Sequence, residues 1–292
     1  GIWYTAVTGI WQTVWMEPVP AAHINSYNVV ADVDASIMKV SVDAAVEDGD
    51  IVEVVLFADG APVAKAEGRE VTLAVPDAKL WSPASPYLYD LKIKVLRGDV
   101  VVDEVKGYTA MREIGVIRDK AGHKRMTLNG EPLFQYGPLD QGWWPDGLYT
   151  APSDEALAYD IEKTKEMGFN LIRKHVKVEP ARWYWHCDRL GMLVWQDMPS
   201  IADNSTNVWD NRTYNDGTDT PVTEEGKANY YKEWSEIINA YKVFPCIVSW
   251  VPFNEAWGQF NTQEVVTATR ELDDTRLINY ASGGNFYREC DA

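Results

Sequence analysis

Short apolar segments alternate with segments of helical period throughout residues 115–292, and this alternation constrains the fold more than any other feature of the sequence. The strand-like segments are 132–139, 169–176, 192–198, 246–253 and 276–282; the helix-like segments are 153–167, 180–190, 224–242 and 262–273. Apolar strands that alternate with amphipathic helices run parallel and are buried on both faces. The pattern therefore predicts an α/β unit, as either an open doubly wound sheet or an eight-stranded barrel.

The ends of the predicted helices carry recognisable signals. Ser153 or Asp154 is the expected N-cap of the first helix, and Gly168 lies just past its end. Pro180 occupies the first turn of the second helix, and Gly191 is expected to end it. These signals support four separate helices between five strands.

Residues 20–114 have a different rhythm, in which apolar and polar residues alternate with period two. About seven short strands are expected there, with hairpin turns at residues 58–60 and 97–99. About 95 residues of this kind predict an immunoglobulin-like β-sandwich, whose expected role is mechanical. A further hairpin is predicted through residues 125–137, where the chain passes into the α/β part.

The composition excludes some partners. The chain has 27 Lys and Arg against 44 Asp and Glu, a net charge of −17, which argues against nucleic acid and anionic membranes and suits a neutral substrate. No apolar run is long enough to span a bilayer. Cys187, Cys246 and Cys290 form no CxxC pair, so neither a zinc site nor a disulfide framework follows, and Cys187 and Cys246 are expected to be core thiols. No cofactor is implied.

The first residues do not resemble a signal peptide, because they lack an initiator Met, a basic region and a small-residue cleavage site. Localisation is therefore not predicted from them.

Polar residues gather where the predicted parallel strands end. They are Asp140, Arg173, His175, Gln196, Asp197, Asn254 and Glu255. Both open sheets and barrels place their sites at the carboxyl ends of the strands. No Gly-x-Gly-x-x-Gly or Walker stretch follows the first strand, which disfavours a nucleotide-dependent enzyme.

Glu255 follows an apolar strand directly, where partial desolvation would hold its pKa up, as an acid catalyst near neutral pH requires. The alternative is that it only caps the next segment. Arg173 and His175 lie two residues apart and so share one face of their strand. There Arg173 could hold a carboxylate ionised; alternatively it forms a structural pair with Asp197.

Tryptophan is abundant, with 13 residues, and most of them are expected to fill cores. Trp143, Trp144 and Trp257 flank the predicted strand ends and could stack on the apolar face of a pyranose. Packing within loops is the alternative for each of them.

Residues 168–200 and 249–260 together resemble glycoside hydrolase family 2, especially its bacterial β-galactosidase-like members. Residues 80–96 and 107–116 resemble the last strands of that family's immunoglobulin-like domain. The resemblance implies three parts: residues 1–19, a remnant of the amino-terminal jelly-roll sugar-binding domain; residues 20–114, the immunoglobulin-like sandwich; and residues 115–292, a partial TIM barrel of about five strands, truncated at its carboxyl end.

The resemblance also implies roles for individual residues. Glu255 matches the general acid/base, Asn254 the residue that hydrogen-bonds the substrate 2-hydroxyl, and Arg173 the arginine that supports the nucleophile. His175 and Asp197 fall where members often contact substrate or shape the site. Trp257 is counted among the substrate-binding candidates for its position beside the strand end, not from the resemblance. The family's nucleophile is a Glu near the end of the seventh strand, which this chain does not reach; Glu289 follows the fifth strand and is not assigned that role. No metal ligand is implied.

The resulting expectation is an exo-acting, retaining glycoside hydrolase that removes a non-reducing β-linked sugar, as a β-galactosidase does. β-Glucuronidase and β-mannosidase are the alternatives within the family. Outside it, a non-catalytic carbohydrate-binding scaffold and a purely structural module remain. The 292-residue chain itself is expected to be inactive without a nucleophile, and an open barrel edge would favour homo-oligomers or marginal stability.

Overall fold

The computed structural model describes residues 5, 7–201, 219 and 221–287 of the chain, which divides into two compact units. One unit comprises residues 13–133 and 243–245; the other comprises residues 1–12, 134–242 and 246–292. The predicted domain limits at residues 19/20 and 114/115 therefore stay a prediction, since the units group the first twelve residues with the α/β part.

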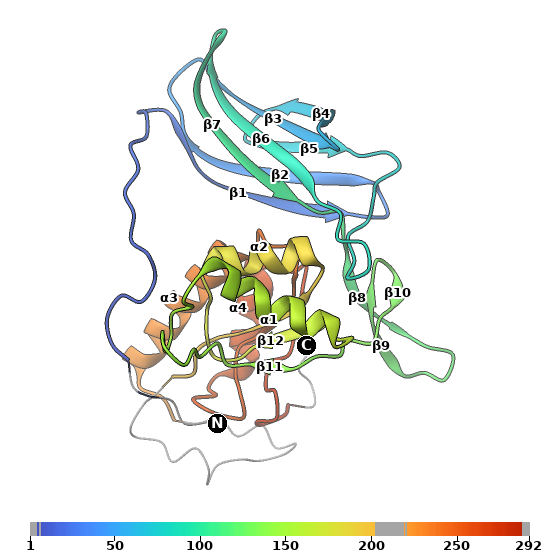
Figure 1. The fold of residues 1–292 in the computed structure, drawn as a ribbon, viewed down its shortest axis with the longest axis vertical. Coiled ribbons are helices and arrows are strands. Elements are labelled where there is room, and N and C mark those ends of the chain that lie inside the picture. Colours follow the sequence, from blue (N-terminus) through green and yellow to red (C-terminus); the bar gives the residue numbers. More distant parts are fainter. Residues whose placement is uncertain (1–4, 6, 202–218, 220, 288–292) are drawn as a thin grey trace. The chain divides into compact units, whose positions relative to one another are not determined.

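The first unit contains a β-sandwich of seven antiparallel strands, as predicted (Figure 1). One sheet has the order β1 (His23–Asp32), β2 (Ile37–Ala45), β5 (Glu70–Ala74). The other has the order β4 (Ala61–Glu67), β3 (Asp50–Ala58), β6 (Tyr89–Arg97), β7 (Val100–Thr109).

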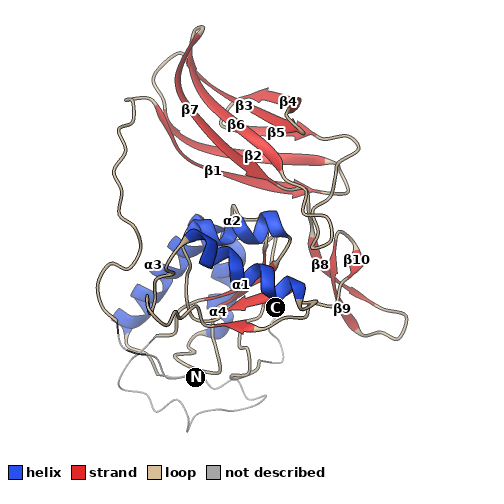
Figure 2. Cartoon of the chain, viewed as in Figure 1, coloured by secondary structure: helices blue, strands red, loops and turns tan. Residues whose placement is uncertain are grey.

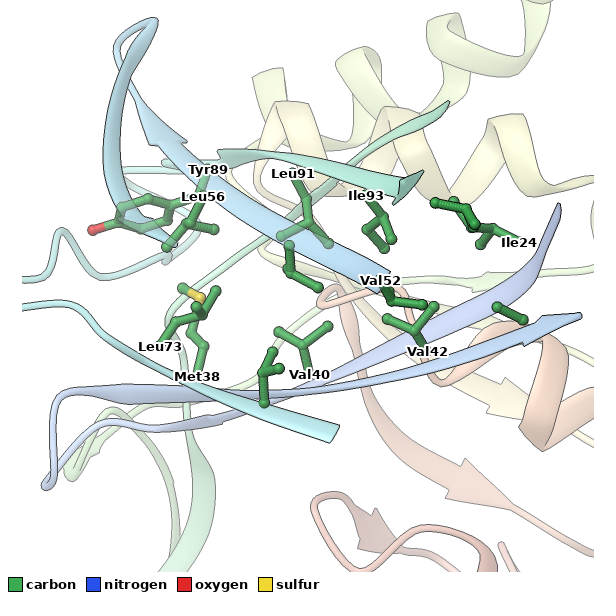
Figure 3. Packing of buried hydrophobic residues seen from close by; sticks show 14 of the residues in the cluster. Ile24, Met38, Val40, Val42, Val52, Leu56, Leu73, Tyr89, Leu91 and Ile93 are labelled. Carbon is green, nitrogen blue, oxygen red and sulfur yellow. The ribbon is translucent and has the colours of Figure 1, made fainter. Parts of the chain in front are cut away.

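The core of the sandwich follows from the period-two pattern. Along β2, Met38, Val40 and Val42 are buried while Lys39 is exposed, because successive side chains of a strand point to opposite faces. Figure 3 shows these side chains packed against those of the other sheet, among them Val52, Leu56, Leu91 and Ile93.

Two-residue turns of left-handed backbone join several strands. The turn between β3 and β4 has φ of 51° at Asp59 and 79° at Gly60, and the turn after β9 has φ of 54° at Asn129 and 78° at Gly130. Positive φ at both central residues is the geometry that matches strand twist in hairpins. The second of these turns belongs to a small sheet of β8 (Ile114–Arg118), β9 (Lys124–Leu128) and β10 (Glu131–Pro132), which confirms the predicted hairpin.

In its described residues, the second unit is a five-stranded parallel sheet with four helices (Figures 1 and 2). The strands are β11 (Leu139–Asp140), β12 (Leu171–Lys174), β13 (Leu193–Asp197), β14 (Ile247–Val251) and β15 (Leu277–Ile278). The helices are α1 (Asp154–Glu166), α2 (Ala181–Leu190), α3 (Glu224–Tyr241) and α4 (Thr262–Leu272).

The strand order distinguishes the two architectures that the sequence left open. Strands β11 to β15 are neighbours in chain order, with every pair parallel. A doubly wound sheet reverses its strand order at a switch point, whereas a barrel adds each strand beside the last. The fold is thus a β-sandwich with a partial (β/α)8 barrel, as predicted.

The predicted helix ends are confirmed. The Ser153 side chain accepts a hydrogen bond from the backbone N–H of Ala156, at 3.2 Å, and so caps α1. Gly168, just after α1, and Gly191, at the end of α2, have left-handed φ of 89° and 73°. Glycine adopts this conformation without the steric cost that other residues meet.

The first barrel strand is shorter than predicted: residues 132–139 were expected, but β11 contains only Leu139 and Asp140. The preceding backbone does run beside β12, since the carbonyl of Pro138 accepts from the backbone N–H of Arg173 at 3.0 Å. Proline, however, has no N–H to return, so the ladder is interrupted there.

Gly137 permits this close approach, because a Cβ built on it would lie 1.6 Å from the backbone oxygen of Leu171. We expect Gly137→Ala to lower the free energy of unfolding by about 1–3 kcal/mol, the usual cost of overpacking, because backbone has to move. Urea denaturation measures this. Gly226→Ala in α3 is the matched control, where a Cβ meets only side-chain atoms, at 3.1 Å or more. Equal stabilities for the two variants would contradict the prediction.

Candidate active site

Arg173 joins the ends of three neighbouring strands. Its Nε donates to Oδ1 of Asp197 at 2.9 Å, and its Nη2 donates to Oδ2 of Asp197 at 2.8 Å and to Oδ1 of Asn254 at 2.9 Å. Asp197 is fully buried, and two parallel bonds of this kind fix both position and plane. The predicted site residues Arg173, Asp197 and Asn254 therefore form one cluster, and the Arg173–Asp197 pair that the sequence offered as an alternative is present.

Asn254 is held in one orientation by this cluster. Its Oδ1 is occupied by Arg173, and its Nδ2 has no hydrogen-bond partner within the part of the chain that the structure describes. The residue is 8% exposed, so its free N–H groups are available at a buried surface. Such a donor suits a ligand hydroxyl.

His175 is oriented by the same carboxylate. Its Nδ1 lies 3.1 Å from Oδ2 of Asp197, which also accepts from the backbone N–H of Val176 at 3.3 Å. An ionised carboxylate only accepts hydrogen bonds, so the Nδ1 atom must carry the proton and the Nε2 atom of a neutral ring is left as an acceptor. Val176 has a φ of 44°, an unfavourable value for a β-branched residue.

A second ionic network lies beside this cluster and engages Asp140. The Lys174 ammonium is 2.6 Å from Oδ2 of Asp140 and 3.0 Å from Oε1 of Glu179, and the Lys177 ammonium is 2.9 Å from the same Glu179 oxygen. Lys174, Lys177 and Glu179 are almost completely buried. Asp140, predicted at the end of the first strand, thus anchors a structural network.

The pKa directions agree with this role. Burial alone would raise the pKa of Asp140, but the charge and hydrogen bond of Lys174 outweigh it and hold that pKa below its ordinary value. Burial opposes ionisation of Lys174 as well, yet Asp140 and Glu179 together raise its pKa. The ionised pair is therefore the stable form at neutral pH.

Glu255 lies differently from the prediction. Strand β14 ends at Val251, and Glu255 follows in a turn with φ of 53°, continued by Ala256 at 66°. The Glu255 side chain is exposed, so the expected shielding at a strand end is wrong for this structure. The left-handed turn carries the carboxylate beyond the strand, out of the apolar surroundings that would desolvate it.

The loop that follows β15 packs against the segment after Glu255 and forms hydrogen bonds with it. The Gln259 side chain donates to the backbone oxygen of Asn285 at 2.8 Å and accepts from its backbone N–H at 2.9 Å. Gly284 packs so closely that a Cβ there would lie 2.4 Å from the backbone nitrogen of Ala256. Gln259 and Asn285 are both fully buried. These hydrogen bonds and this close packing fix the backbone turn that contains Glu255.

The three tryptophan candidates have different surroundings. Trp257 is half-buried, and its backbone N–H donates to the Asn254 carbonyl at 2.9 Å, which places it in the Glu255 turn. Trp143 packs edge-on against Tyr149, with ring centroids 5.4 Å apart. Trp144 is half-buried, and its indole Nε1 finds no hydrogen-bond partner within the described part of the chain.

The remaining sequence candidates are structural. Gln196 is buried and accepts from the Tyr184 hydroxyl at 2.5 Å. Cys187 and Cys246 are buried free thiols, as predicted, while Cys290 lies outside the described residues.

The described residues contain no group of three or more His, Cys, Asp or Glu that could hold a metal ion. None of the helices in the described ranges is long and apolar enough to cross a membrane.

Sequence reasoning missed Lys174, Lys177, Glu179, Gln259 and Asn285. Lys174 had one usable signal, because it stands inside residues 169–176, which were predicted to be buried on both faces, whereas Lys177 lies just outside them. A buried charge implies a partner. Gln259 and Asn285 had no such signal, because their pairing depends on how two loops return to each other.

The parallel β/α sheet gathers an Arg–Asp–Asn cluster, followed by a glutamate, at the carboxyl ends of its strands, where barrel enzymes carry their sites. The chain belongs to the glycosyl hydrolases family 2. The family model for its TIM barrel domain matches residues 124–291, and a second model, described as glycosyl hydrolases family 2, matches residues 11–112.

Individual relatives agree with this assignment. A β-galactosidase of Lactococcus lactis subsp. lactis is 25% identical over 288 residues, which cover 97% of this chain and 27% of the relative. A Formosa agariphila protein with a provisional β-glucuronidase name is 31% identical over 215 residues, 73% of this chain and 19% of that protein. The β-glucuronidase structure of Ruminococcus gnavus superposes with a TM-score of 0.76 at 23% identity, covering 89% of this chain and 43% of that one. The chain thus spans less than half of each relative.

Proposed function

We propose that the natural protein carrying this sequence is a retaining glycoside hydrolase that removes a non-reducing β-linked sugar, with a β-galactoside as its substrate. The observation that carries the proposal is the hydrogen-bonded cluster of Arg173, Asp197 and Asn254, which is followed directly by Glu255 in a chain of this family. Relatives named as β-galactosidases support the choice of sugar.

Each residue of the cluster has a part in the proposed reaction. Glu255 protonates the glycosidic oxygen and, in the second step, takes a proton from water. Its exposed position gives it access to both leaving group and water. Asn254, whose Nδ2 has no partner among the described residues, donates to the 2-hydroxyl of the bound sugar. Arg173 keeps Asn254 in place through the bond to its Oδ1.

His175, Asp197 and Trp257 complete the proposed sugar site. Asp197 fixes His175, whose Nε2 is then an acceptor for a sugar hydroxyl. Trp257 is half-buried in the Glu255 turn, where its ring can cover the apolar face of a pyranose.

β-Glucuronides and β-mannosides are the competing substrates, and relatives named as β-glucuronidases give the first of them weight. The net charge of −17 argues against an anionic glucuronide, because the field of the protein would repel it. Hydrolysis of the nitrophenyl β-galactoside, β-glucuronide and β-mannoside by the natural protein decides among them. We expect the highest kcat/KM for the galactoside, with the β-anomer released first. A preference for another sugar, or first release of the α-anomer, would overturn the proposal.

A non-catalytic carbohydrate-binding scaffold is the other outcome to exclude. Such a scaffold would bind sugar equally well after Asn254→Ala or Glu255→Gln and would show no turnover in its natural form. Self-association of the chain remains a prediction, which light scattering can test.

We expect the 292-residue chain on its own to give no turnover of nitrophenyl β-galactoside. Retaining hydrolysis needs a second carboxylate as nucleophile. The described carboxylates at the strand ends are engaged, Asp197 by Arg173 and His175 and Asp140 by Lys174. Clear turnover that is abolished by Glu255→Gln would contradict this expectation.

A further inference from the structure

A chain of hydrogen bonds runs from Asp219, between β13 and α3, to the turn that contains Glu255. The Thr262 hydroxyl donates to Oδ1 of Asp219 at 2.8 Å, and the Thr262 backbone N–H donates to Oδ2 at 3.2 Å. The side-chain nitrogen of Gln259 then donates to the Thr262 hydroxyl oxygen at 3.0 Å. Thr262 and Gln259 are almost completely buried, so water does not compete for the bond between them.

The direction of each bond in this chain follows from the chemistry of its groups. A carboxylate only accepts hydrogen bonds, so the single hydrogen of the Thr262 hydroxyl is committed to Asp219 and its oxygen is left to accept. That oxygen is met by the amide nitrogen of Gln259, which also donates to the Asn285 carbonyl at 2.8 Å. The amide oxygen accepts from the Asn285 N–H at 2.9 Å. Both amide hydrogens of Gln259 are thereby used, and its orientation is fixed.

The backbone around Glu255 is of a kind that needs such support. Glu255 and Ala256 have φ of 53° and 66°, and Asn261 and Ser282 on the neighbouring segments have φ of 39° and 40°. Left-handed backbone is unfavourable for residues other than glycine and persists where the surroundings enforce it. Gln259 contributes to this enforcement through its main chain as well, since its backbone N–H donates to the Ala256 carbonyl at 3.2 Å.

The loop after β15, which Gln259 holds, also lies beside Glu255 itself. A Cβ built on Gly283 would lie 3.9 Å from Cγ of Glu255, and one built on Gly284 would lie 2.4 Å from the backbone nitrogen of Ala256. Loss of the bonds to Gln259 would therefore change the position of the Glu255 side chain.

Asp219 also has a purely structural use, which a test has to separate from a role in catalysis. Asn261, the N-cap residue of α4, makes no side-chain capping bond within the described residues, and Asp219 instead accepts from the first backbone N–H of the helix. A carboxylate there also complements the helix dipole. Removing only the Thr262 hydroxyl leaves this backbone bond in place and breaks the chain to Gln259.

We propose that Thr262 is a positioning residue for the general acid/base. Its hydroxyl links Asp219 to Gln259 and so fixes the turn from which Glu255 reaches the glycosidic oxygen. The proposal rests on the proposed function, because it takes Glu255 as the acid/base. Thr262 acts only through the geometry of Glu255, so its loss should lower the rate only where proton transfer by Glu255 is needed.

Hydrolysis of phenyl β-galactoside and of a dinitrophenyl β-galactoside by the natural protein tests the proposal. Thr262→Val keeps the shape of the side chain and removes the hydroxyl. We expect kcat/KM for the phenyl substrate to fall about 10- to 100-fold, as a small misplacement of a reacting group implies. For the dinitrophenyl substrate it should change by less than about threefold, because that leaving group departs without a proton. Thr262→Ser keeps the hydroxyl and should retain wild-type rates within about twofold.

Thr269→Val is the matched control on the same helix. Thr269 is also fully buried, and its hydroxyl also forms two bonds, donating to the Val265 carbonyl at 2.7 Å and accepting from the Trp234 indole at 2.9 Å. The change in chemistry is thus the same, at a place that has no connection to the Glu255 turn. This variant should lose stability and yet keep the wild-type kcat/KM for both substrates.

Two further variants complete the test. In the Glu255→Gln background, Thr262→Val should lower kcat/KM for the phenyl substrate by no more than about a further twofold, because the effects of residues that act as a unit do not add. Asp219→Ala removes the acceptor at the start of the chain and should show the same dependence on the leaving group. It covers the case in which Thr262→Val does not fold.

The outcomes separate this proposal from the proposed function. Wild-type rates for Thr262→Val, equal losses on both substrates, or losses that multiply in the double variant would each overturn the positioning role alone. If Glu255→Gln itself lost as much rate on the dinitrophenyl substrate as on the phenyl substrate, the proposed function would fail as well.

Discussion

Glutamine in place of Glu255 is expected to lower kcat of the natural protein about 10²- to 10⁴-fold on a galactoside with a poor leaving group, the usual contribution of a general acid/base. Glutamine preserves the size of the side chain and removes its proton. The loss should be smaller for a dinitrophenyl galactoside, because that leaving group departs without protonation. Steady-state kinetics on both substrates measures the difference.

Azide gives an independent test of the same role. It attacks the glycosyl-enzyme ester without a base, so it should accelerate Glu255→Ala on the dinitrophenyl substrate and yield a β-galactosyl azide. Glu264→Gln is the matched control, an exposed glutamate in the first turn of α4 that should keep wild-type rates. Equal losses on both substrates with no azide effect would show that Glu255 only supports the structure.

Alanine in place of Lys174 is expected to lower the free energy of unfolding by about 3–5 kcal/mol, because it leaves buried charge without its partner. Lys174 is 1% exposed and lies between the carboxylates of Asp140 and Glu179, which would then face each other. Urea denaturation at pH 7 measures the loss. Lys163→Ala provides the control, since its exposed pair with Glu166 contributes only about 0–1 kcal/mol.

The loss should depend on pH in a defined direction. Asp140 has a depressed pKa in the folded protein, so its contribution is present above its unfolded pKa, about 3.9, and is lost as pH falls through the folded value. Without Lys174, the largest influence that lowers the pKa of this carboxyl is lost, while burial still acts to raise that pKa. The difference in stability between wild type and Lys174→Ala should therefore narrow as pH falls below about 4, where wild type loses the contribution of Asp140. A constant difference would contradict the ionic explanation.

Local signals in the sequence predicted most of the fold. Ser153, Gly168 and Gly191 mark helix ends because capping and left-handed backbone depend on few neighbouring residues. The seven-strand sandwich followed from alternation, and the parallel sheet from apolar strands between helices. The choice between barrel and open sheet required the strand order, which no local pattern contains.

The sequence predicted which residues belong to the candidate site better than it predicted how they are arranged. Arg173, Asp197 and Asn254 could be placed together because parallel strands end at one edge. The exposure of Glu255 could not be predicted, because it follows from two successive non-glycine residues with positive φ. The sequence rarely indicates such a conformation. Lys174 could be suspected from its charge in a segment predicted to be buried, but its partners Asp140 and Glu179 lie outside that segment.

The two hydrogen bonds between Gln259 and Asn285 constrain the amino acid at position 259 more than the amino acid at position 285. Gln259 contributes its side chain, whereas residue 285 contributes only main-chain atoms to these two bonds. Another amino acid at 285 could still offer the same N–H and C=O, but a shorter side chain at 259 could not span the gap. These bonds should therefore tolerate substitutions at position 285 among relatives, but not at position 259. A substitution at position 259 would alter the position of Glu255 without removing any contact with a sugar.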